Sequence, residues 1–214
     1  MPLVHRTLTL GPMDNNTYLV ACGETRDAAV IDVGFEPEAV IDAVRDAGLH
    51  VVMLLNTHAH WDHVAGMRAV QEALGGTYWV HPADRDLMDA FNAQGASFGF
   101  PPARLPDDPH DLIDGQSLRL GGGALRVLHT PGHAPGHVAF VDLDVAWSGD
   151  TLFAGSVGRT DLAGGSWPDL ERSIRERLFP LGDAMRVHPG HGPATTIGHE
   201  RLTNPFVGEP ARFA

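Results

Sequence analysis

Histidine and aspartate are concentrated in one short segment of the chain. Residues 58–63 contain three histidines and one aspartate in the order H-x-H-x-D-H. Histidine is the commonest metal ligand in proteins, and neighbouring histidines would repel one another if they were protonated. A bound cation favours their neutral forms. The segment therefore predicts a metal site rather than a group of solvated loop histidines.

Three more potential ligands each stand beside a glycine, directly after a predicted strand. They are His133 in the sequence P-G-H, Asp150 in S-G-D and His191 in P-G-H-G. Glycine allows the sharp backbone turns that such positions need. With the H-x-H-x-D-H segment, these residues supply five histidines and two aspartates, which exceeds the four donors of a closed structural zinc site. Two divalent metal ions that share one ligand account for the surplus.

The elements that must position these donors follow from the hydrophobic pattern. The continuous apolar run at 51–55 predicts a buried strand that leads directly into the H-x-H-x-D-H segment. Residues 92–109, rich in Gly, Pro and Asp, are expected to form a surface excursion. Further strands are expected at 3–10, 17–22, 28–33, 77–80, 117–120, 125–129, 138–141, 145–147 and 184–188, and helices at 37–48, 64–74, 83–91 and 170–179. This order predicts β-sheets sandwiched by helices.

Composition narrows the class of protein. A chain of 214 residues with 43% apolar residues suits one compact α/β domain. Its formal charge of −12 without a basic patch argues against a nucleic-acid partner. No signal-peptide pattern and no apolar run of ~20 residues is present, so we expect no membrane association. The single cysteine, Cys22, excludes an internal disulfide and fits a reducing compartment, so we expect the cytoplasm.

The ordered set of metal-binding motifs resembles the metallo-β-lactamase superfamily, over nearly the whole chain. The resemblance implies an αβ/βα sandwich of two mixed β-sheets flanked by helices, with the site at the shared edge of the sheets. It also implies two divalent metal ions, with zinc expected and iron or manganese as alternatives. The implied ligands are His58, His60 and His133 for the first metal, Asp62, His63 and His191 for the second, and Asp150 as a bridge between both.

Within the superfamily, the chain is most similar to a short glyoxalase II-like, or hydroxyacylglutathione hydrolase-like, bacterial branch. The similarity rests on H-W-D-H at 60–63, V-G-R-T-D at 157–161 and E-R-L-T-N-P-F at 200–206. It implies hydrolysis of a glutathione-derived thioester of the S-lactoylglutathione type by attack of a metal-bound hydroxide. Only 23 residues follow His191, so we expect a single domain over 1–214, without the helical C-terminal domain of full-length glyoxalase II.

Several residues receive more specific roles from this comparison. Asp62 is expected to orient the bound hydroxide, and Asp150 to fix the separation of the metals. Asp32, at the end of a predicted strand, matches a family position and is expected either to support a metal ligand or to cap a turn. Arg159 is expected either to clamp a substrate carboxylate or to pair with Asp161.

The same metal-binding motifs are compatible with other functions. An iron-dependent glutathione persulfide dioxygenase would share all the metal motifs and would use His58, His133 and Asp150 to bind one iron. That branch usually has Asp-Tyr after its final histidine, whereas Gly192 and Pro193 follow here, which favours hydrolysis. A lactonase is a further alternative, and a non-catalytic metal-binding protein would usually have lost some of these ligands.

Overall fold

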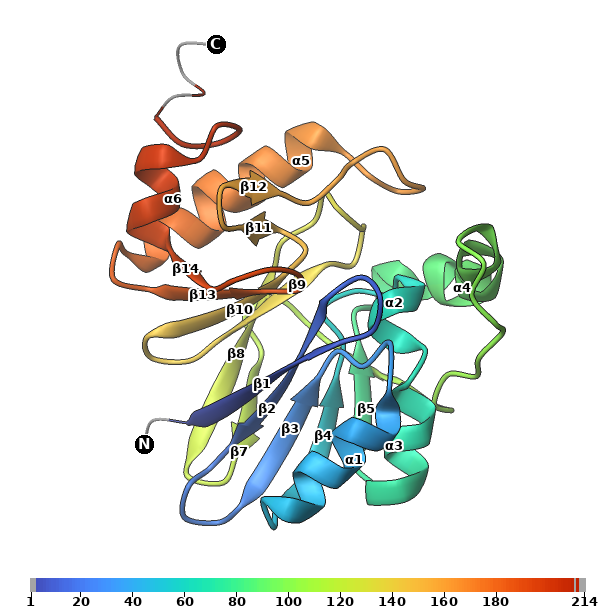
Figure 1. The fold of residues 1–214 in the computed structure, drawn as a ribbon. Coiled ribbons are helices and arrows are strands. Elements are labelled where there is room, and N and C mark those ends of the chain that lie inside the picture. The colour runs from blue at the N-terminus through green and yellow to red at the C-terminus, as the bar shows by residue number, and fades with distance from the viewer. Residues whose placement is uncertain (1–2, 210, 212–214) are drawn as a thin grey trace.

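The computed structural model describes residues 3–209 and 211. Two six-stranded sheets pack against each other, and helices cover the outer face of each sheet (Figure 1). The first sheet is ordered β1 (Val4–Leu10), β2 (Asn15–Ala21), β3 (Asp27–Ile31), β4 (His50–Leu55), β5 (Thr77–Val80) and β6 (His110–Asp111). The second is ordered β14 (Thr195–Thr196), β13 (Arg186–Pro189), β10 (Val145–Gly149), β9 (Val138–Val141), β8 (Gly123–His129) and β7 (Ser117–Leu120).

Both sheets are mixed. In the first sheet β3, β4, β5 and β6 run parallel, while β1, β2 and β3 are antiparallel. In the second, β10 and β13 are parallel and the other pairs are antiparallel. A short hairpin of β11 (Leu152–Phe153) and β12 (Ser156–Val157) follows β10. The αβ/βα sandwich expected from the sequence is confirmed.

The helices lie on the two outer faces of the sandwich. The first half of the chain provides α1 (Pro37–Asp46), α2 (Trp61–Val64), α3 (Met67–Leu74), the 3-10 turn η1 (Pro82–Asp84) and α4 (Arg85–Ser97). The second half provides α5 (Trp167–Arg172), the π-helical turn η2 (Ser173–Leu178), the 3-10 turn η3 (Phe179–Leu181) and α6 (Ile197–Thr203). None of the helices in the described residues is long and apolar enough to cross a bilayer.

Side chains from both sheets fill the space between them. The apolar sequence of β4 is continuous because both faces of the strand are buried. Met53 and Leu55 face this inter-sheet core, while Leu54 faces the layer of α1 and α3. A strand with helices on one face and a second sheet on the other buries both sets of side chains. Phe140 and Trp147 face the same inter-sheet core from the second sheet. The strand ends are thereby held in a rigid frame.

The expected surface excursion at 92–109 is wrong in its first part. The helix predicted at 83–91 continues as α4 to Ser97. Gly95, which resembles a helix breaker in the sequence, is buried within this helix. A Cβ at Gly95 would lie 2.3 Å from the Trp61 side chain, so this glycine permits close packing instead of ending the helix. Phe100, also in the predicted excursion, stacks on Trp61.

Other boundaries differ by a few residues. The helix predicted at 64–74 begins only at Met67, as α3, and the separate short helix α2 ends at Val64. Between them, the Gly66 backbone N–H donates to the Val33 carbonyl at 2.8 Å. The strand predicted at 28–33 ends at Ile31, so that Asp32 directly follows it. The strand predicted at 184–188 begins at Arg186. The short strands β6, β11, β12 and β14 and the helix α6 were not predicted.

Candidate metal centre

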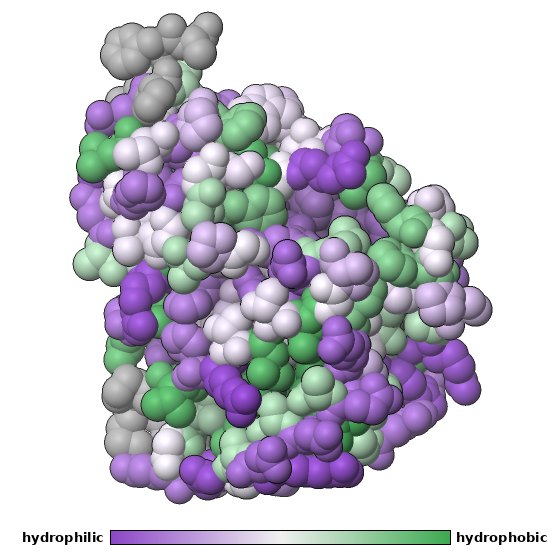
Figure 2. Space-filling model, viewed as in Figure 1, coloured by the Kyte–Doolittle hydropathy of each residue, from purple (hydrophilic) through white to green (hydrophobic). Residues whose placement is uncertain are grey.

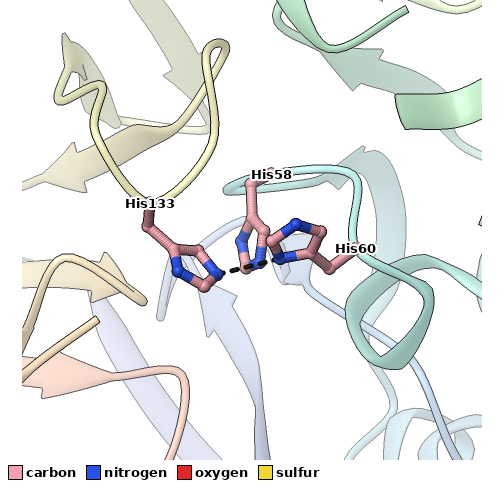
Figure 3. Close-up of side chains that lie close together, drawn as sticks. All are labelled: His58, His60 and His133. Atoms are coloured by element: carbon pink, nitrogen blue, oxygen red, sulfur yellow. Dashed lines mark hydrogen bonds between the residues drawn. The ribbon is translucent and has the colours of Figure 1, made fainter. Parts of the chain in front are cut away.

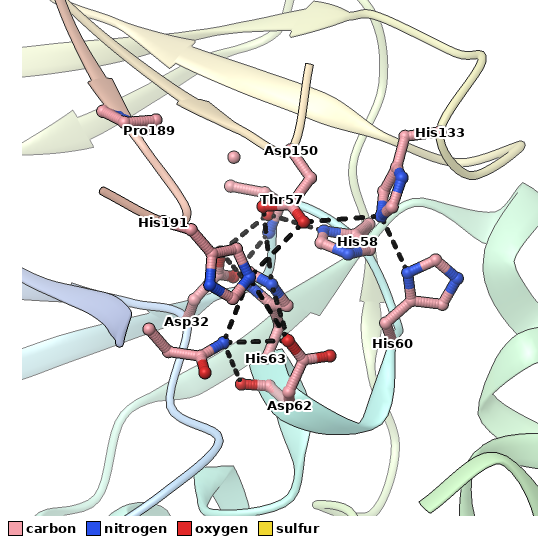
Figure 4. Close-up of polar contacts among 12 residues, drawn as sticks. Asp32, Thr57, His58, His60, Asp62, His63, His133, Asp150, Pro189 and His191 are labelled. Atoms are coloured by element: carbon pink, nitrogen blue, oxygen red, sulfur yellow. Dashed lines mark hydrogen bonds and ion pairs between the residues drawn. The ribbon is translucent and has the colours of Figure 1, made fainter. Parts of the chain in front are cut away.

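All seven predicted ligands lie at one edge of the sandwich, after the ends of four strands (Figure 4). The segment 58–63 follows β4 of the first sheet, and His133 follows β8 of the second. Asp150 and His191 follow the parallel neighbours β10 and β13. Loops at the ends of neighbouring strands can therefore converge from distant parts of the sequence.

His58, His60 and His133 form the first group, here called the three-histidine cluster. Each offers a ring nitrogen within 4.8 Å of the others, and all three side chains are buried (Figure 3). The His133 Nδ1 lies 2.7 Å from the Arg159 carbonyl, to which it can only donate. This hydrogen bond leaves His133 Nε2 as a lone-pair donor, and Nε2 faces His60 Nδ1 at 2.9 Å.

Asp62, His63 and His191 form the second group, here called the mixed cluster, whose donor atoms also lie within 4.8 Å of one another. The Nδ1 of His63 donates to Asp32 Oδ2 at 3.0 Å, and the Nδ1 of His191 donates to the Met13 carbonyl at 2.9 Å. Both hydrogen bonds occupy Nδ1, so Nε2 is the ring nitrogen that would bind a metal once it has lost its proton. The two Nε2 atoms lie 3.4 Å and 3.3 Å from Asp62 Oδ2.

Asp150 lies between the two clusters. Its Oδ2 is 3.6 Å from His133 Nε2 and 3.5 Å from His191 Nε2, and its Oδ1 is 3.6 Å from His63 Nε2. The carboxylate therefore faces the donors of both groups. Gly190 makes this approach possible, because a Cβ there would lie 2.1 Å from Asp150 Oδ1.

The donor set fits two divalent cations. His58 Nε2, His63 Nε2 and Asp150 Oδ1 are buried without a hydrogen-bond partner among the described residues. A buried polar atom without a partner is costly, and a metal ion would satisfy several of these atoms at once. Neutral imidazole and carboxylate donors in two groups with a shared aspartate suit zinc, iron or manganese.

The protonation states of the two clusters differ. Burial lowers the pKa of His60 to about 3 and that of His58 well below its usual value, so both rings are neutral and ready to bind a metal. Burial also disfavours the charged form of His63. The carboxylates of Asp62 and Asp150 outweigh this effect and raise the pKa of His63 to about 10. In the absence of metal, the mixed cluster therefore holds a proton at neutral pH.

Asp32 contacts the mixed cluster through the Nδ1 of His63. Its Oδ1 accepts hydrogen bonds from the Asn56 side chain and the Thr57 backbone, and its Oδ2 accepts from Thr57 Oγ1 and His63 Nδ1. The backbone of Asp32 adopts the left-handed conformation, with φ 54°, which is uncommon outside glycine. Asp32 thus contacts both the segment that leads into His58 and the His63 ring, and its role in metal binding stays a prediction.

Arg159 lines the cavity over the site and pairs with Asp161 through two hydrogen bonds of 2.7 and 2.8 Å. This ion pair with Asp161 is one of the two roles expected for Arg159. The other, a clamp for a substrate carboxylate, stays a prediction. His137 stacks on His58 of the three-histidine cluster, with ring centroids 5.0 Å apart. Its Nε2 accepts a hydrogen bond from the Asp150 backbone N–H at 2.9 Å.

Sequence reasoning missed Asp84, which connects the two loops of the three-histidine cluster. Its Oδ2 accepts from the Ala59 N–H at 2.9 Å, and its Oδ1 accepts from the Gly136 N–H at 2.5 Å. The side chain is fully buried, and burial raises its pKa to about 6. Ala59 separates His58 from His60, and Gly136 lies in the loop of His133. Nothing in the local sequence H-P-A-D at 81–84 indicates this role.

Asn15 was also missed. Its side-chain amide donates to the backbone carbonyl and to Oδ2 of Asp62, both at 2.9 Å. The two hydrogen bonds orient the Asp62 carboxylate toward the mixed cluster. Asn15 begins β2, in the M-D-N-N-T segment at 13–17 after a glycine-proline turn, and the sequence resembles an ordinary turn.

The clusters form the floor of a cavity of about 340 Å³. Backbone segments from both halves of the sandwich make its walls, so that a small molecule entering the cavity meets the two groups of donors directly. Such a cavity with a few converging polar groups is the usual form of a small-molecule site.

The family model of the metallo-beta-lactamase superfamily matches residues 10–196. The chain belongs to this superfamily. The chain is 39% identical to a Haemophilus influenzae protein named hydroxyacylglutathione hydrolase GloC, over 86% of this chain and 89% of that protein. The predicted resemblance to a glyoxalase II-like branch of the metallo-β-lactamase superfamily is confirmed by this relative.

Two solved structures of the superfamily have the same fold. The chain is 43% identical to TTHA1623, crystallised in a di-iron-bound form, with a TM-score of 0.86 over 94% of this chain and 99% of that one. It is 35% identical to BLEG-1, a B3 metallo-beta-lactamase, with a TM-score of 0.87 over 95% and 99% of the two chains. These relatives are a hydrolase, a di-iron protein and a β-lactamase by name, so the superfamily alone does not choose the substrate or the metal.

Proposed function

We propose that this protein is a binuclear metal hydrolase that cleaves a glutathione-derived thioester of the S-lactoylglutathione type. The observation that carries the proposal is the grouping of seven donors into two clusters that share Asp150 on the floor of one cavity. The likeness to a hydroxyacylglutathione hydrolase supports the substrate class. The single buried cysteine supports a cytoplasmic location for the reaction.

When bound, two divalent cations would lower the pKa of a water molecule toward neutrality and polarise the thioester carbonyl. The chain's own residues would position these parts. His58, His60 and His133 would hold one cation, and Asp62, His63 and His191 the other. Asp150 would contact both, and Asn15 would keep Asp62 turned toward the nucleophile. Hydrolysis adds the oxygen of water to the acyl carbon and breaks the C–S bond, which releases a carboxylate and a thiol.

The persulfide dioxygenase is the second candidate. A one-iron mechanism on His58, His133 and Asp150 would leave the mixed cluster without a function, although its three donors lie within 4.8 Å of one another. This observation favours two metals and therefore hydrolysis. The di-iron form of a relative means that iron binding alone would not argue for oxygen chemistry.

The test is to load the protein separately with zinc and with iron and to supply S-lactoylglutathione or glutathione persulfide. Release of free thiol and uptake of oxygen are both followed. We expect thioester cleavage with two metals per chain and no oxygen uptake. The metal-free protein is the control for background hydrolysis. Iron-dependent oxygen uptake without thioester cleavage by either metal form would overturn the proposal.

A further inference from the structure

The cavity over the metal centre has polar residues on its floor and apolar residues on its walls. Phe98 and Phe100 come from the segment after α4, Phe153 from the β11–β12 hairpin and Leu162 from the loop that follows it. The four side chains therefore reach the cavity from two segments that are distant in the sequence. Apolar walls around a few polar groups favour ligands that bring an apolar part close to the reacting bond.

The two phenylalanines after α4 differ in how they are held. Phe100 stacks on Trp61, with ring centroids 4.7 Å apart and an interplanar angle of 12°. Phe35 packs against both rings, so this part of the wall is fixed. Phe98 is 51% exposed although it lines the cavity. An aromatic ring exposed at the rim of a site can bury its surface when a ligand arrives.

A second hollow of about 230 Å³ adjoins the first. Gln94, Phe98 and Leu162 line both hollows. The second hollow is otherwise lined mainly by small or apolar side chains of α4, including Leu87 and Ala90. The apolar surface therefore continues from the metal centre past Phe98 and along α4. In Figure 2, hydrophobic surface gathers in the region of α4, where Figure 1 places the edge of the molecule.

Charged groups are scarce along these walls. Among the described residues that line either hollow, Arg159 is the only lysine or arginine, and it is already paired with Asp161. Gln94 accepts a hydrogen bond from the Trp61 backbone N–H at 2.7 Å through its side-chain oxygen. The walls thus offer a continuous contact for an apolar group.

We propose that the two joined hollows bind an apolar substituent of the thioester, a medium-length alkyl chain or an aryl group, and that Phe98 selects for it. This inference rests on the proposed thioester hydrolysis. The substituent extends from the reacting carbonyl region, past the ring of Phe98, into the hollow along α4. Each methylene group that becomes fully buried would increase affinity about fourfold.

Binding can be tested without turnover by using thioethers that cannot be hydrolysed. We expect the zinc-loaded protein to bind S-hexylglutathione at least about tenfold more tightly than S-methylglutathione, as measured by calorimetry. Phe98→Ala should remove most of this difference. Phe206→Ala is the matched control, because Phe206 is similarly exposed but lines neither hollow. Equal affinities for the two thioethers, or a difference that Phe98→Ala leaves intact, would overturn the inference.

Turnover then identifies the side of the thioester that carries the apolar group. Hexanoyl and acetyl thioesters of N-acetylcysteamine vary the acyl side, and acetyl thioesters of hexanethiol and ethanethiol vary the thiol side. A higher kcat/KM for the longer member of either pair, lost in Phe98→Ala, supports the inference and assigns the side. Cleavage that is independent of chain length in both pairs overturns it and leaves the proposed function standing. Tight binding of S-hexylglutathione without cleavage of any thioester would support the apolar site and contradict the hydrolase.

Discussion

The two clusters of the metal centre are built from similar donors but differ in charge and support. The three-histidine cluster has only imidazole rings, and burial keeps His58 and His60 neutral. The mixed cluster contains Asp62 and lies near Asp150, and these carboxylates raise the pKa of His63 to about 10. His191 is also the most open of the donors, with 23% of its side chain exposed.

This difference teaches how one scaffold places two unlike groups of candidate metal ligands side by side. Without metal, burial favours the neutral forms of His58 and His60 in the first cluster. In the second cluster, the carboxylates of Asp62 and Asp150 favour the protonated form of His63. We infer that a metal binds the three-histidine cluster without displacing a proton, whereas a metal at the mixed cluster must compete with one.

The largest expected effect tests whether the two clusters act together. His191→Ala removes a donor of the mixed cluster and leaves the three-histidine cluster intact. We expect the metal content to fall from two toward one per chain and kcat to fall by about 1000-fold or more, because the binuclear arrangement is lost. Elemental analysis and steady-state kinetics measure both. His199→Ala, which changes an exposed histidine away from the site, is the control. Full activity of the parent protein with one equivalent of metal would contradict the binuclear mechanism.

The next effect is specific to the three-histidine cluster. Asp84→Asn replaces one carboxylate oxygen with an NH2 group. The side chain can then no longer accept hydrogen bonds from the backbone N–H groups of both Ala59 and Gly136. We expect the free energy of unfolding to fall by about 1–3 kcal/mol and the affinity of this cluster for metal to fall by about 10- to 100-fold. Chelator competition and cobalt absorption spectra follow the metal, and urea unfolding follows stability.

The matched control for this substitution is Asp89→Asn, which makes the same change on the exposed surface of α4. A merely structural role for Asp84 predicts lower stability with an unchanged cobalt spectrum. Equal weakening of both clusters would show that the contacts of Asp84 do not act on the three-histidine cluster alone.

The pH dependence of metal affinity should also differ between the two clusters, with a smaller effect than that of the substitutions above. The pKa of His63 is raised to about 10 in the metal-free protein, so His63 stays protonated up to that pH. Affinity of the mixed cluster for metal should therefore rise by up to about tenfold per pH unit between pH 7 and 10. The three-histidine cluster should bind metal with little pH dependence over this range, because His60 is already neutral. Isothermal titration in buffers of different ionisation enthalpy measures the proton released with each metal.

The same proton has the opposite effect on the stability of the metal-free protein. A raised pKa contributes stability that is fully present below the unfolded pKa of about 6.5 and is lost as pH rises through the folded pKa. We expect the melting temperature of the metal-free protein to fall between pH 7 and 10, while metal affinity increases. A melting temperature that rises over this interval would contradict the assignment of the proton to His63.

The smallest effect concerns Arg159, whose side chain contacts neither cluster. If it binds a substrate carboxylate, Arg159→Ala should lower kcat/KM for S-lactoylglutathione by about tenfold and leave metal content unchanged. The lactoyl thioester of N-acetylcysteamine, which has no carboxylate, should be unaffected. The backbone carbonyl that accepts from His133 remains in the variant. A large fall in melting temperature with unchanged kinetics would support a structural pair with Asp161 instead.

The sequence alone predicted the fold class, which the structure confirms, and the seven candidate donors, which the structure brings together. Strand β4 was predicted because its apolar residues are continuous, and the histidines after it were recognisable because their spacing is local. His133, Asp150 and His191 were found from the glycine turns that follow strands. These signals lie within a few residues of one another, so they can be read along the chain.

The tertiary structure decided what no local pattern contains. Asp84 and Asn15 matter because they contact residues 25 and 47 positions away, and their own neighbourhoods resemble ordinary turns. The start of the segment 92–109 was wrongly placed in a surface excursion for the same reason, because only the position of the Trp61 ring explains the glycine at position 95 of the helix. The charge of His63 likewise depends on carboxylates that three different loops bring together. Hydrogen bonds, close packing and electrostatic shifts depend on distances in space, and the sequence specifies those distances only through the complete fold.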